Sequence, residues 1–409
     1  MRPTSFPKDK LKVLLLENVH PSAVKMFKNS GYSDIEIHSG SLSEKELMDK
    51  ISKVHILGIR SKTLLTDNIL KKAEKLLAVG AFCIGTNQID MKSATREGIA
   101  VFNSPFSNTR SVAELVIGLS IILMRRITEK NEGAHKGLWL KESSGCFEVR
   151  GKTLGIIGYG HIGSQVSVLA ESMGMKVIFY DAASKLSLGN ATPCRSMDEL
   201  LKNSDIVSLH VPGNNETKNL INYSRLKKMK KGAILINLSR GDVMDVKAVK
   251  EALISKQIGG LGVDVFPEEP QSNKDIFSSP LQNLPNVILT PHIGGSTMEA
   301  QEAIGLDVAE KLISFTETGS SNGSLTVPEI SLPLLNNAHR ILHIHHNVPG
   351  VLSQVNGVLS KMKVNILGQY LQTNREIGYV VLDIDKKSSS KAMGELKKVK
   401  NTIRTRDLY

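Results

Sequence analysis

The stretch Lys152–Asp181, KTLGIIGYGHIGSQVSVLAESMGMKVIFYD, decides the fold. It reads as a short apolar strand, a glycine-rich turn, an amphipathic helix and a second apolar strand. This is one βαβ unit, and such units build parallel sheets with helices on both faces. The turn has the spacing G-x-G-x-x-G over Gly158–Gly163, and Asp181 closes the second strand. In this context the pattern predicts a dinucleotide site.

The three glycines of this turn have separate roles. Gly158 permits the tight turn, Gly160 lets the backbone approach a pyrophosphate, and Gly163 lets the helix pack closely on the strand. The N-terminus of the helix adds free N–H donors and the positive end of its dipole. Asp181 is placed to accept hydrogen bonds from the ribose hydroxyls, and its charge opposes a 2′-phosphate. NAD is therefore predicted rather than NADP, with only Lys185 nearby to favour the phosphorylated cofactor.

Short apolar runs continue the alternation of strand and helix on both sides of the turn. Two α/β blocks are predicted, and a long helix near residue 108 opens the second. A helix over 297–316 is expected to return to the first block, and the Ser-, Pro- and Asn-rich segment 322–337 reads as a linker. The last ~70 residues read as strand, helix, strand, strand, helix, strand, which is the ferredoxin-like order.

Composition bounds the class of protein. The chain has 409 residues and a net charge of +12, and aromatic residues make up only 4%. A length of this kind fits two or three domains. Few aromatics and no basic DNA-reading motif argue against a nucleic-acid partner. Three cysteines are too few for a disulfide framework, and no apolar segment is long enough for a signal or a membrane span. A cytoplasmic protein without a membrane partner is predicted.

Three polar residues follow predicted strands, where ligands of doubly wound sheets bind. Arg240 ends AILINLSR, Glu269 follows GVDVFPEE, and His292 ends NVILTPH. Arg240 can bind a substrate carboxylate with its planar fork, and neutral His292 can remove a hydroxyl proton while hydride leaves for the nicotinamide. Glu269 would hydrogen-bond the other ring nitrogen and raise the pKa of His292. Together these residues indicate a 2-hydroxyacid dehydrogenase.

The stretches LGIIGYGHIG, VIFYD, MKKGAILINLSRGDVMD and LTPHIGGST resemble the signatures of the D-isomer-specific 2-hydroxyacid dehydrogenases. IRSKT, VGAFCIGTNQID, FNSPFSNTRSVAELV and the C-terminal domain resemble the bacterial branch that acts on 3-phosphoglycerate and carries a single ACT domain. The resemblance covers essentially the whole chain. It implies NAD-dependent oxidation of 3-phosphoglycerate to 3-phosphohydroxypyruvate, the first committed step of L-serine synthesis.

The resemblance also implies an architecture of three domains. A Rossmann-type NAD-binding domain over 108–295 is inserted into a flavodoxin-like α/β substrate domain formed by 1–107 and 296–336. A ferredoxin-like ACT domain over 337–409 follows. The family is expected to be homotetrameric, and Trp139 and Lys141 match positions that reach a neighbouring subunit.

Further site residues follow from the same resemblance. Arg60, Ser61 and Asn108, with Arg240 and Lys141, match substrate-binding positions. The matching cofactor contacts are Gly158, Gly160, His161, Ile162, Gly163, Asp181, Asn237, Leu238, Ser239, Arg240, Asp264, His292, Ile293, Gly294 and Gly295.

The segment HIHHNVPGVLSQVNGVLSKMKVNILGQY resembles the start of an ACT domain. In that resemblance His345, Asn347 and Asn365 bind L-serine as an effector, while His346 and Val348 depart from the pattern of close relatives. Three histidines stand close together in HIHH, but no acid or thiol lies beside them, so no metal is predicted.

Two alternatives stay open. One is a broader 2-oxoacid reductase acting on 2-oxoglutarate or glyoxylate, because a second carboxylate could occupy phosphate donors. The other is an NAD-sensing transcriptional corepressor, since the same fold serves both classes.

Overall fold

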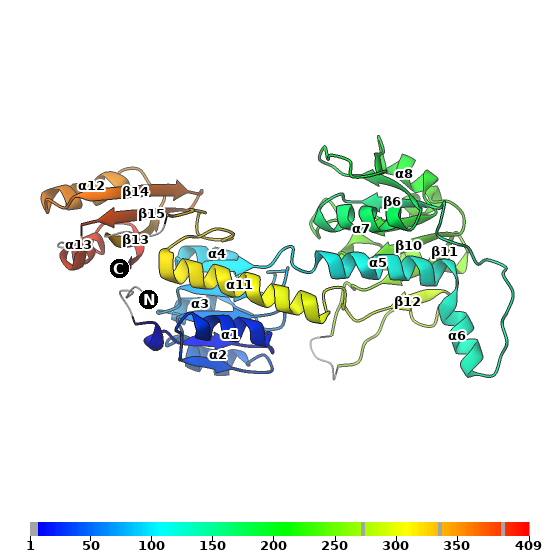
Figure 1. Cartoon of the computed structure of the whole chain (residues 1–409), viewed down its shortest axis with the longest axis horizontal. Helices are drawn as coiled ribbons and strands as arrows, with labels where there is room; N and C mark the ends of the chain where they lie inside the picture. The colour runs from blue at the N-terminus through cyan, green and yellow to red at the C-terminus, as the bar shows by residue number, and fades with distance from the viewer. Residues whose placement is uncertain (1–6, 271–274, 334–337, 386–388, 409) are drawn as a thin grey trace. The chain divides into compact units, whose positions relative to one another are not determined.

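The computed structural model describes residues 7–270, 275–333, 338–385 and 389–408. The chain divides into two compact units. One unit is continuous, Asn108–Ala300, and it is inserted between the two segments of the other, Met1–Ser107 and Gln301–Tyr409. The second crossing therefore lies a few residues after the predicted position at 295–296 (Figure 1).

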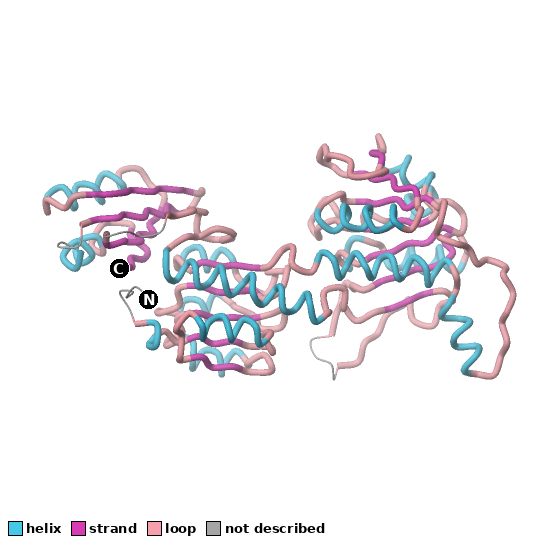
Figure 2. The backbone as a smooth tube through the Cα atoms, in the orientation of Figure 1, coloured by secondary structure: helices cyan, strands magenta, loops and turns pink. Residues whose placement is uncertain are grey.

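The inserted unit contains a parallel sheet in the order β12-β11-β10-β9-β6-β7-β8. Two sets of strands run outward from the junction of β6 and β9, which is the doubly wound Rossmann arrangement. Helices cover both faces (Figure 2). The strands are β6 (Thr153–Ile157), β7 (Lys176–Tyr180), β8 (Thr192–Pro193), β9 (Ile206–Leu209), β10 (Ala233–Asn237), β11 (Ile258–Val263) and β12 (Val287–Leu289). The helices are α5 (Thr109–Met124), α6 (Ile127–His135), α7 (His161–Ser172), α8 (Met197–Asn203), α9 (Tyr223–Lys228), η2 (Gly241–Val243) and α10 (Val246–Ile254).

The first segment of the other unit forms a parallel sheet in the order β2-β1-β3-β4-β5, the flavodoxin-like order. Its strands are β1 (Val13–Leu15), β2 (Ile35–Ile37), β3 (Ile56–Ile59), β4 (Ala78–Ala81) and β5 (Ala100–Asn103). Its helices are η1 (Lys8–Lys10), α1 (Pro21–Asn29), α2 (Glu44–Ile51), α3 (Asp67–Lys72) and α4 (Met91–Arg96). Pro21 occupies the first turn of α1, and a Ser43–Glu46 capping box opens α2.

Helix α11 (Met298–Thr318) returns to this sheet, as the sequence predicts. Val308 and Leu312 lie so close to Gly80 of β4 that a side chain there would collide with both. Both residues belong to one buried cluster with Val13 and Leu15 of β1. The C-terminal segment thus completes the core of the first sheet.

The prediction of a linker over 322–337 is wrong for the part that the structure describes. Leu325 donates its backbone N–H to Val101, and the Thr326 hydroxyl donates to Ile99. Val327 and Ile330 are buried in the same core as β1. A loop without periodicity is held here by backbone pairing along β5, which composition does not reveal. Residues 334–337 lie outside the described residues.

The C-terminal domain is a sheet in the order β14-β15-β13-β16, with antiparallel pairing throughout and helices on one face. This is the predicted ferredoxin-like arrangement. The elements are β13 (His339–His346), α12 (Val351–Lys361), β14 (Ile366–Thr373), β15 (Ile377–Ile384), α13 (Ser389–Leu396) and β16 (Thr402–Leu408).

The face of this sheet away from its helices packs on α11 and on the part of the same unit that holds the β1–β5 sheet. Leu342, Ile344 and Tyr379 share a buried cluster with Phe315 of α11. The Tyr379 hydroxyl donates to the carbonyl of Gly319 at 2.6 Å. The C-terminal domain therefore shares a continuous core with the domain it follows.

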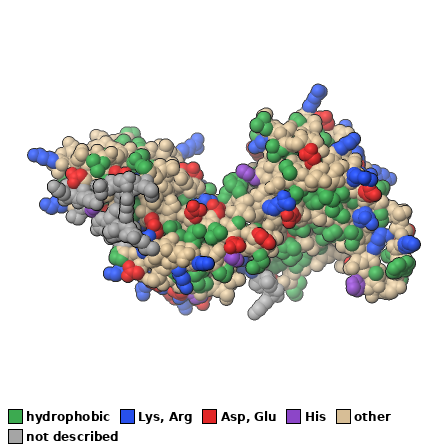
Figure 3. All heavy atoms as spheres, in the orientation of Figure 1, with side chains coloured by type: hydrophobic (Ala, Val, Ile, Leu, Met, Phe, Trp, Pro, Cys, Tyr) green, Lys and Arg blue, Asp and Glu red, His purple; other side chains and the backbone are tan. Residues whose placement is uncertain are grey.

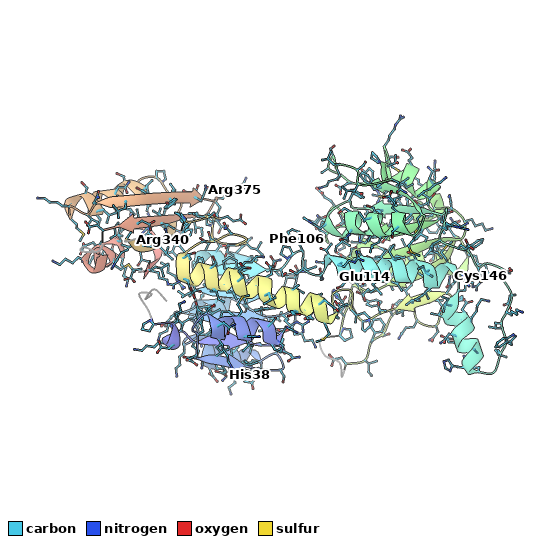
Figure 4. All side chains as sticks on the ribbon, viewed as in Figure 1. His38, Phe106, Glu114, Cys146, Arg340 and Arg375 are labelled. Atoms are coloured by element: carbon cyan, nitrogen blue, oxygen red, sulfur yellow. The ribbon has the colours of Figure 1, made fainter. Side chains whose placement is uncertain are left out.

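Buried arginines add polar links to the same packing. Arg340, labelled in Figure 4, is fully buried and holds Asp383 through two nitrogen–oxygen contacts of 2.7 Å. Its remaining nitrogen donates to the carbonyl of Thr318. Arg404 and Arg406 donate to the carbonyls of Leu76 and Thr316. On the face drawn in Figure 3, Lys and Arg side chains and Asp and Glu side chains are both scattered over the described surface.

Candidate active site

His292 sits on a turn that follows β12, the edge strand of the Rossmann sheet. Its φ of 54° is left-handed, a backbone conformation that is uncommon for residues other than glycine. Its Nδ1 lies 2.8 Å from Oε2 of Glu269. Because a carboxylate can only accept, Nδ1 carries the proton and Nε2 keeps a lone pair. The side chain is half-exposed, so Nε2 is open to a ligand.

The contact between His292 and Glu269 shifts the pKa of both residues. The hydrogen bond that His292 donates to Glu269, aided by the charge of Glu269, raises the pKa of His292, while partial burial and the charge of Arg240 oppose the rise. Partial burial on its own would raise the pKa of Glu269, but the hydrogen bond and charge of His292 outweigh it and the pKa falls. The arrangement keeps Glu269 ionised and His292 ready to hold a proton.

Asp264 lies beneath the His292 turn and is almost fully buried. Its Oδ1 accepts from the Thr290 hydroxyl at 2.6 Å and from the N–H of Ile293 at 2.8 Å. Its Oδ2 accepts from the N–H of Gly294 at 2.8 Å. These bonds hold the backbone around His292, and the cofactor contact expected for Asp264 stays a prediction.

Arg240 follows β10, next to the strand that precedes Glu269. Asn237 is fully buried, donates to the carbonyl of Arg240 at 2.9 Å and accepts from the N–H of Ser239 at 3.0 Å. A side chain at Gly241 would collide with the backbone of Phe266, so glycine is required where the two strand-end loops meet. Asn237 and Gly241 thus fix the backbone from which the Arg240 side chain extends.

The glycine turn has the geometry that its three roles require. Gly158 has a φ of 94°, and a Cβ there would collide with the carbonyl of His210. A Cβ at Gly163 would collide with the carbonyl of Gly158, so helix α7 packs directly on the turn. Apart from the adjoining backbone, no heavy atom of the described residues lies within 4 Å of a Cβ built at Gly160, which leaves open space beside the N-terminus of α7. A pyrophosphate fits that opening.

Asp181 ends β7 and supports the same turn. Its Oδ2 accepts from the N–H of Tyr159 and its Oδ1 from the N–H of Ala183, at 2.8 and 2.9 Å. Two carboxylate oxygens offer about four lone-pair directions, so each can still accept from a ribose hydroxyl. His161 and Ile162 form the first turn of α7 directly after Gly160.

Asn108 and Gly295 lie against each other in the inserted unit. A Cβ built at Gly295 would lie 2.5 Å from Nδ2 of Asn108, the residue before α5. Asn108 is buried, and its Oδ1 has no partner among the described residues. A predicted substrate residue and a predicted cofactor residue are therefore neighbours.

Arg60 and Ser61 follow β3, at the carboxyl edge of the β1–β5 sheet. Ser61 is exposed and Arg60 is partly exposed. Lys141 and Trp139 lie on the long loop after α6, and Trp139 is 86% exposed. That loop also carries Cys146, labelled in Figure 4.

In the C-terminal domain, His343 and His345 lie on β13 with ring centroids 5.3 Å apart. Burial lowers the pKa of His343 to about 4 and lowers that of His345, so both rings are neutral near pH 7. Gly378 faces His345, because a Cβ there would lie 2.5 Å from Nε2. Asn347 is exposed and donates to the carbonyl of Asn374 at 2.7 Å, and Asn365, also exposed, precedes β14.

The structure adds functional candidates that the sequence alone does not single out. His210 follows β9 beside the glycine turn, its Nε2 lies 2.8 Å from the Ser208 hydroxyl, and burial lowers its pKa to about 4. Glu17 and Gln88 contact the backbone of the Arg60 loop. Each lies in or just after an apolar run that predicts a strand, and this is the signal available in the sequence. No group of three or more His, Cys, Asp or Glu residues within the described ranges is arranged to hold a metal ion.

Comparisons with known proteins show which family the chain resembles. Residues 117–294 match the NAD-binding domain of the D-isomer-specific 2-hydroxyacid dehydrogenases, and residues 341–404 match an ACT domain like that of the AHAS small subunit. A solved D-lactate dehydrogenase from Aquifex aeolicus, complexed with NAD and lactic acid, superposes with a TM-score of 0.68 at 29% identity and covers 78% of this chain and 100% of its own.

The chain belongs to the D-isomer-specific 2-hydroxyacid dehydrogenase family, with an NAD-binding Rossmann domain and a C-terminal ACT domain. Within that family, curated relatives that match the full length of the chain include D-3-phosphoglycerate dehydrogenases. The protein of that name from Escherichia coli K12 is 52% identical over the full length of both chains. The Dictyostelium discoideum protein is 51% identical over 99% of each chain.

Proposed function

We propose that this chain is an NAD-dependent oxidoreductase that converts 3-phospho-D-glycerate to 3-phosphohydroxypyruvate, the first committed step of L-serine synthesis. The observation that carries the chemistry is the 2.8 Å contact between His292 Nδ1 and Glu269. The full-length likeness to D-3-phosphoglycerate dehydrogenases supports the choice of substrate.

In the forward reaction, His292 Nε2 takes the proton of the C2 hydroxyl, and Glu269 stabilises the imidazolium that forms. Arg240 binds the substrate carboxylate with its planar fork, since its own loop backbone is already held by Asn237. Bound NAD supplies the hydride acceptor. In reverse, the imidazolium of His292 returns the proton to the C2 oxygen.

The cofactor is proposed to lie along the glycine turn and the adjoining strand ends. The open space at Gly160 and the first turn of α7 receive the pyrophosphate, and Asp181 accepts from the ribose. The remaining proposed contacts are Gly158, His161, Ile162, Gly163, Asn237, Leu238, Ser239, Arg240, Asp264, His292, Ile293, Gly294 and Gly295.

Substrate phosphate is proposed to bind Arg60 and Ser61, with Asn108 and Lys141 as further donors. Guanidinium and hydroxyl groups suit a phosphate because they donate several hydrogen bonds, and the guanidinium does so in a planar fork. Lys141 and Trp139 are proposed to reach a second subunit of a homotetramer. The exposed apolar side chains around them, Leu138, Leu140 and Phe147, are consistent with a covered surface.

L-serine is proposed to regulate the enzyme by binding His345, Asn347 and Asn365. Asn347 donates to Asn374, and Asn374 in turn donates to the carbonyl of Thr326 on the substrate-binding part of the unit. The effector site thus lies two hydrogen bonds from the loop that pairs with β5. Asn347→Ala is expected to raise the serine concentration needed for half-inhibition.

Deleting residues 337–409 would test serine binding less specifically than Asn347→Ala, because the deletion exposes the apolar surface around Phe315.

The domain boundaries proposed are 1–107 with 296–336 for substrate, 108–295 for NAD and 337–409 for the ACT domain. We place the enzyme in the cytoplasm. Within the described residues, no helix is long and apolar enough to cross a membrane.

The deciding experiment follows NADH consumption with phosphohydroxypyruvate, glyoxylate and 2-oxoglutarate, each with and without serine. The proposal requires the highest kcat/KM for phosphohydroxypyruvate and inhibition by serine. A higher kcat/KM for glyoxylate or 2-oxoglutarate would instead indicate a broad 2-oxoacid reductase. NADH binding without turnover of any of the three would indicate a cofactor-sensing corepressor.

A further inference from the structure

We propose that Glu17 and Gln88 are positioning residues that hold the Arg60–Ser61 loop in the conformation that receives the substrate phosphate. This inference rests on the proposed function. The two residues supply a carboxylate and an amide. Neither is proposed to touch cofactor or substrate, and both act through the Arg60–Ser61 loop.

Glu17 lies just beyond β1 and is 7% exposed. Its Oε1 accepts from the backbone N–H of Arg60 at 3.2 Å and of Thr63 at 2.8 Å, and its Oε2 accepts from the N–H of Lys62 at 2.9 Å. Three donors from one short loop therefore converge on one buried carboxylate. Hydrogen bonds to a charged acceptor are stronger than neutral ones.

The backbone of Glu17 is itself fixed for this task. Its φ of 62° and that of Asn18, 54°, are both left-handed. The N–H groups of these two residues donate to the carbonyls of Gly40 and His38, at 3.1 Å each. Left-handed non-glycine residues persist where surrounding contacts determine them, and they concentrate at functional sites.

Gln88 holds the next peptide unit of the same loop, through the carbonyl of Arg60. It is 8% exposed, and its Nε2 donates to the carbonyl of Arg60 at 2.6 Å and to that of Gly85 at 3.3 Å. Arg60 is thus held at its N–H by Glu17 and at its carbonyl by Gln88. Meanwhile the side chains of Arg60, Ser61 and Lys62 make no hydrogen bond or ion pair within the part of the chain that the structure describes, so all three are available to an anion.

A buried negative charge beneath an anion site has two opposite consequences. By charge alone, Glu17 repels a phosphate and weakens its binding. By geometry, only a carboxylate satisfies the three N–H groups, because glutamine has a single oxygen and would turn an NH₂ group toward a donor. We infer that geometry outweighs repulsion, since a loop already in its binding conformation loses less entropy when the ligand arrives.

The test compares Glu17→Gln with the wild-type enzyme, on phosphohydroxypyruvate and on glyoxylate, which has no phosphate. The KM for phosphohydroxypyruvate is expected to rise at least about tenfold, the value of one hydrogen bond to a charged group. Its kcat, the KM for NADH and the KM for glyoxylate are expected to change less than about threefold. Glu317→Gln is the matched control, because Glu317 pairs with Lys8 in the same unit, and it is expected to leave all four constants unchanged.

Gln88→Leu provides a second variant, which keeps the size of the side chain and removes both donors. It is expected to raise the same KM several-fold, and it decides the question if Glu17→Gln does not fold. Its control is Gln257→Leu, which should leave this KM unchanged, since Gln257 donates hydrogen bonds to the carbonyls of Leu226 and Met229 in the other unit.

A lower KM for phosphohydroxypyruvate in Glu17→Gln would show that repulsion dominates and would overturn the proposal. Equal losses on both oxoacids, or a change in kcat alone, would do the same. These outcomes presuppose wild-type turnover of phosphohydroxypyruvate. A wild-type enzyme that turns over only glyoxylate would reject the proposed substrate itself, and the phosphate-specific role would fall with it.

Discussion

Asp264 in the nucleotide-binding unit and Glu17 in the substrate-binding unit are buried carboxylates, each beneath a turn at the carboxyl edge of a parallel sheet. Asp264 accepts from two consecutive N–H groups and a hydroxyl, and Glu17 accepts from three N–H groups. The two turns differ in whether the side chain that each one carries is held by a hydrogen bond. The His292 ring is held through Nδ1 by Glu269, whereas the Arg60 side chain has no hydrogen-bond partner among the described residues.

The difference matches the chemistry proposed for each turn. Proton transfer needs one nitrogen at one position with one protonation state, so both backbone and ring are constrained. Binding a phosphate needs positive charge and several donors, and a long side chain can adjust to it once its backbone is placed. Changes at the first turn should therefore lower kcat, and changes at the second should raise KM.

The largest effect is expected from His292→Ala. Loss of the proton acceptor should lower kcat by about 10³-fold, within the range for general acid–base catalysis, while NADH binding persists. Steady-state kinetics and a fluorescence titration with NADH measure the two quantities. His135→Ala, at the end of α6, is the control and should be active. A loss below tenfold would remove His292 from the proton-transfer role.

Asp264→Asn is expected to lower kcat by about 10- to 100-fold, because a small misplacement of a catalytic group has an effect of this size. The KM for phosphohydroxypyruvate should change little, in contrast to Glu17→Gln. Asp205→Asn is the matched control, since Asp205 also accepts a backbone N–H, from Thr153, in the same unit. A KM effect without a kcat effect would mean that the two carboxylates do not differ as described.

Glu269→Gln should shift the pH profile as well as reduce activity. The carboxylate raises the pKa of His292, so its removal lowers that pKa. Oxidation requires neutral His292, and its rate rises with pH through this pKa. The rising limb of kcat/KM for 3-phosphoglycerate should therefore move to lower pH in the variant. An unmoved limb would separate Glu269 from the titration of His292.

Asp181 is a third carboxylate beneath a turn, and changing it is expected to have the smallest effect, on the preference for NADH over NADPH. Asp181 accepts from Tyr159 beneath the glycine turn and is proposed to exclude a 2′-phosphate. The kcat/KM with NADH should exceed that with NADPH by at least about tenfold, and Asp181→Ala should narrow the ratio. Lys185→Ala, which removes the nearby cation, should widen it. Equal use of both cofactors by the wild-type enzyme would contradict this role.

The sequence by itself determined the doubly wound fold, the NAD site and the C-terminal ferredoxin-like domain. These depend on local signals: apolar runs of strand length, a glycine spacing fixed by backbone sterics, and an acid at the end of the next strand. The sequence also predicts Arg240, Glu269 and His292 as catalytic residues, because the carboxyl ends of parallel strands meet at one edge of a sheet. The spacing of these residues along the chain was sufficient to predict a common site.

Only the tertiary structure decided what supports these residues. Glu17 and Thr63 are far apart in sequence, as are Gln88 and Arg60, and no periodicity links them; the pairing depends on β1, β3 and β4 lying side by side. The packing of residues 322–333 along β5 and the core shared by Tyr379 and Phe315 are equally non-local. Local patterns report which element a residue belongs to, whereas the partner of a buried polar group is set by strand order and by side chains that reach it from elsewhere in the chain.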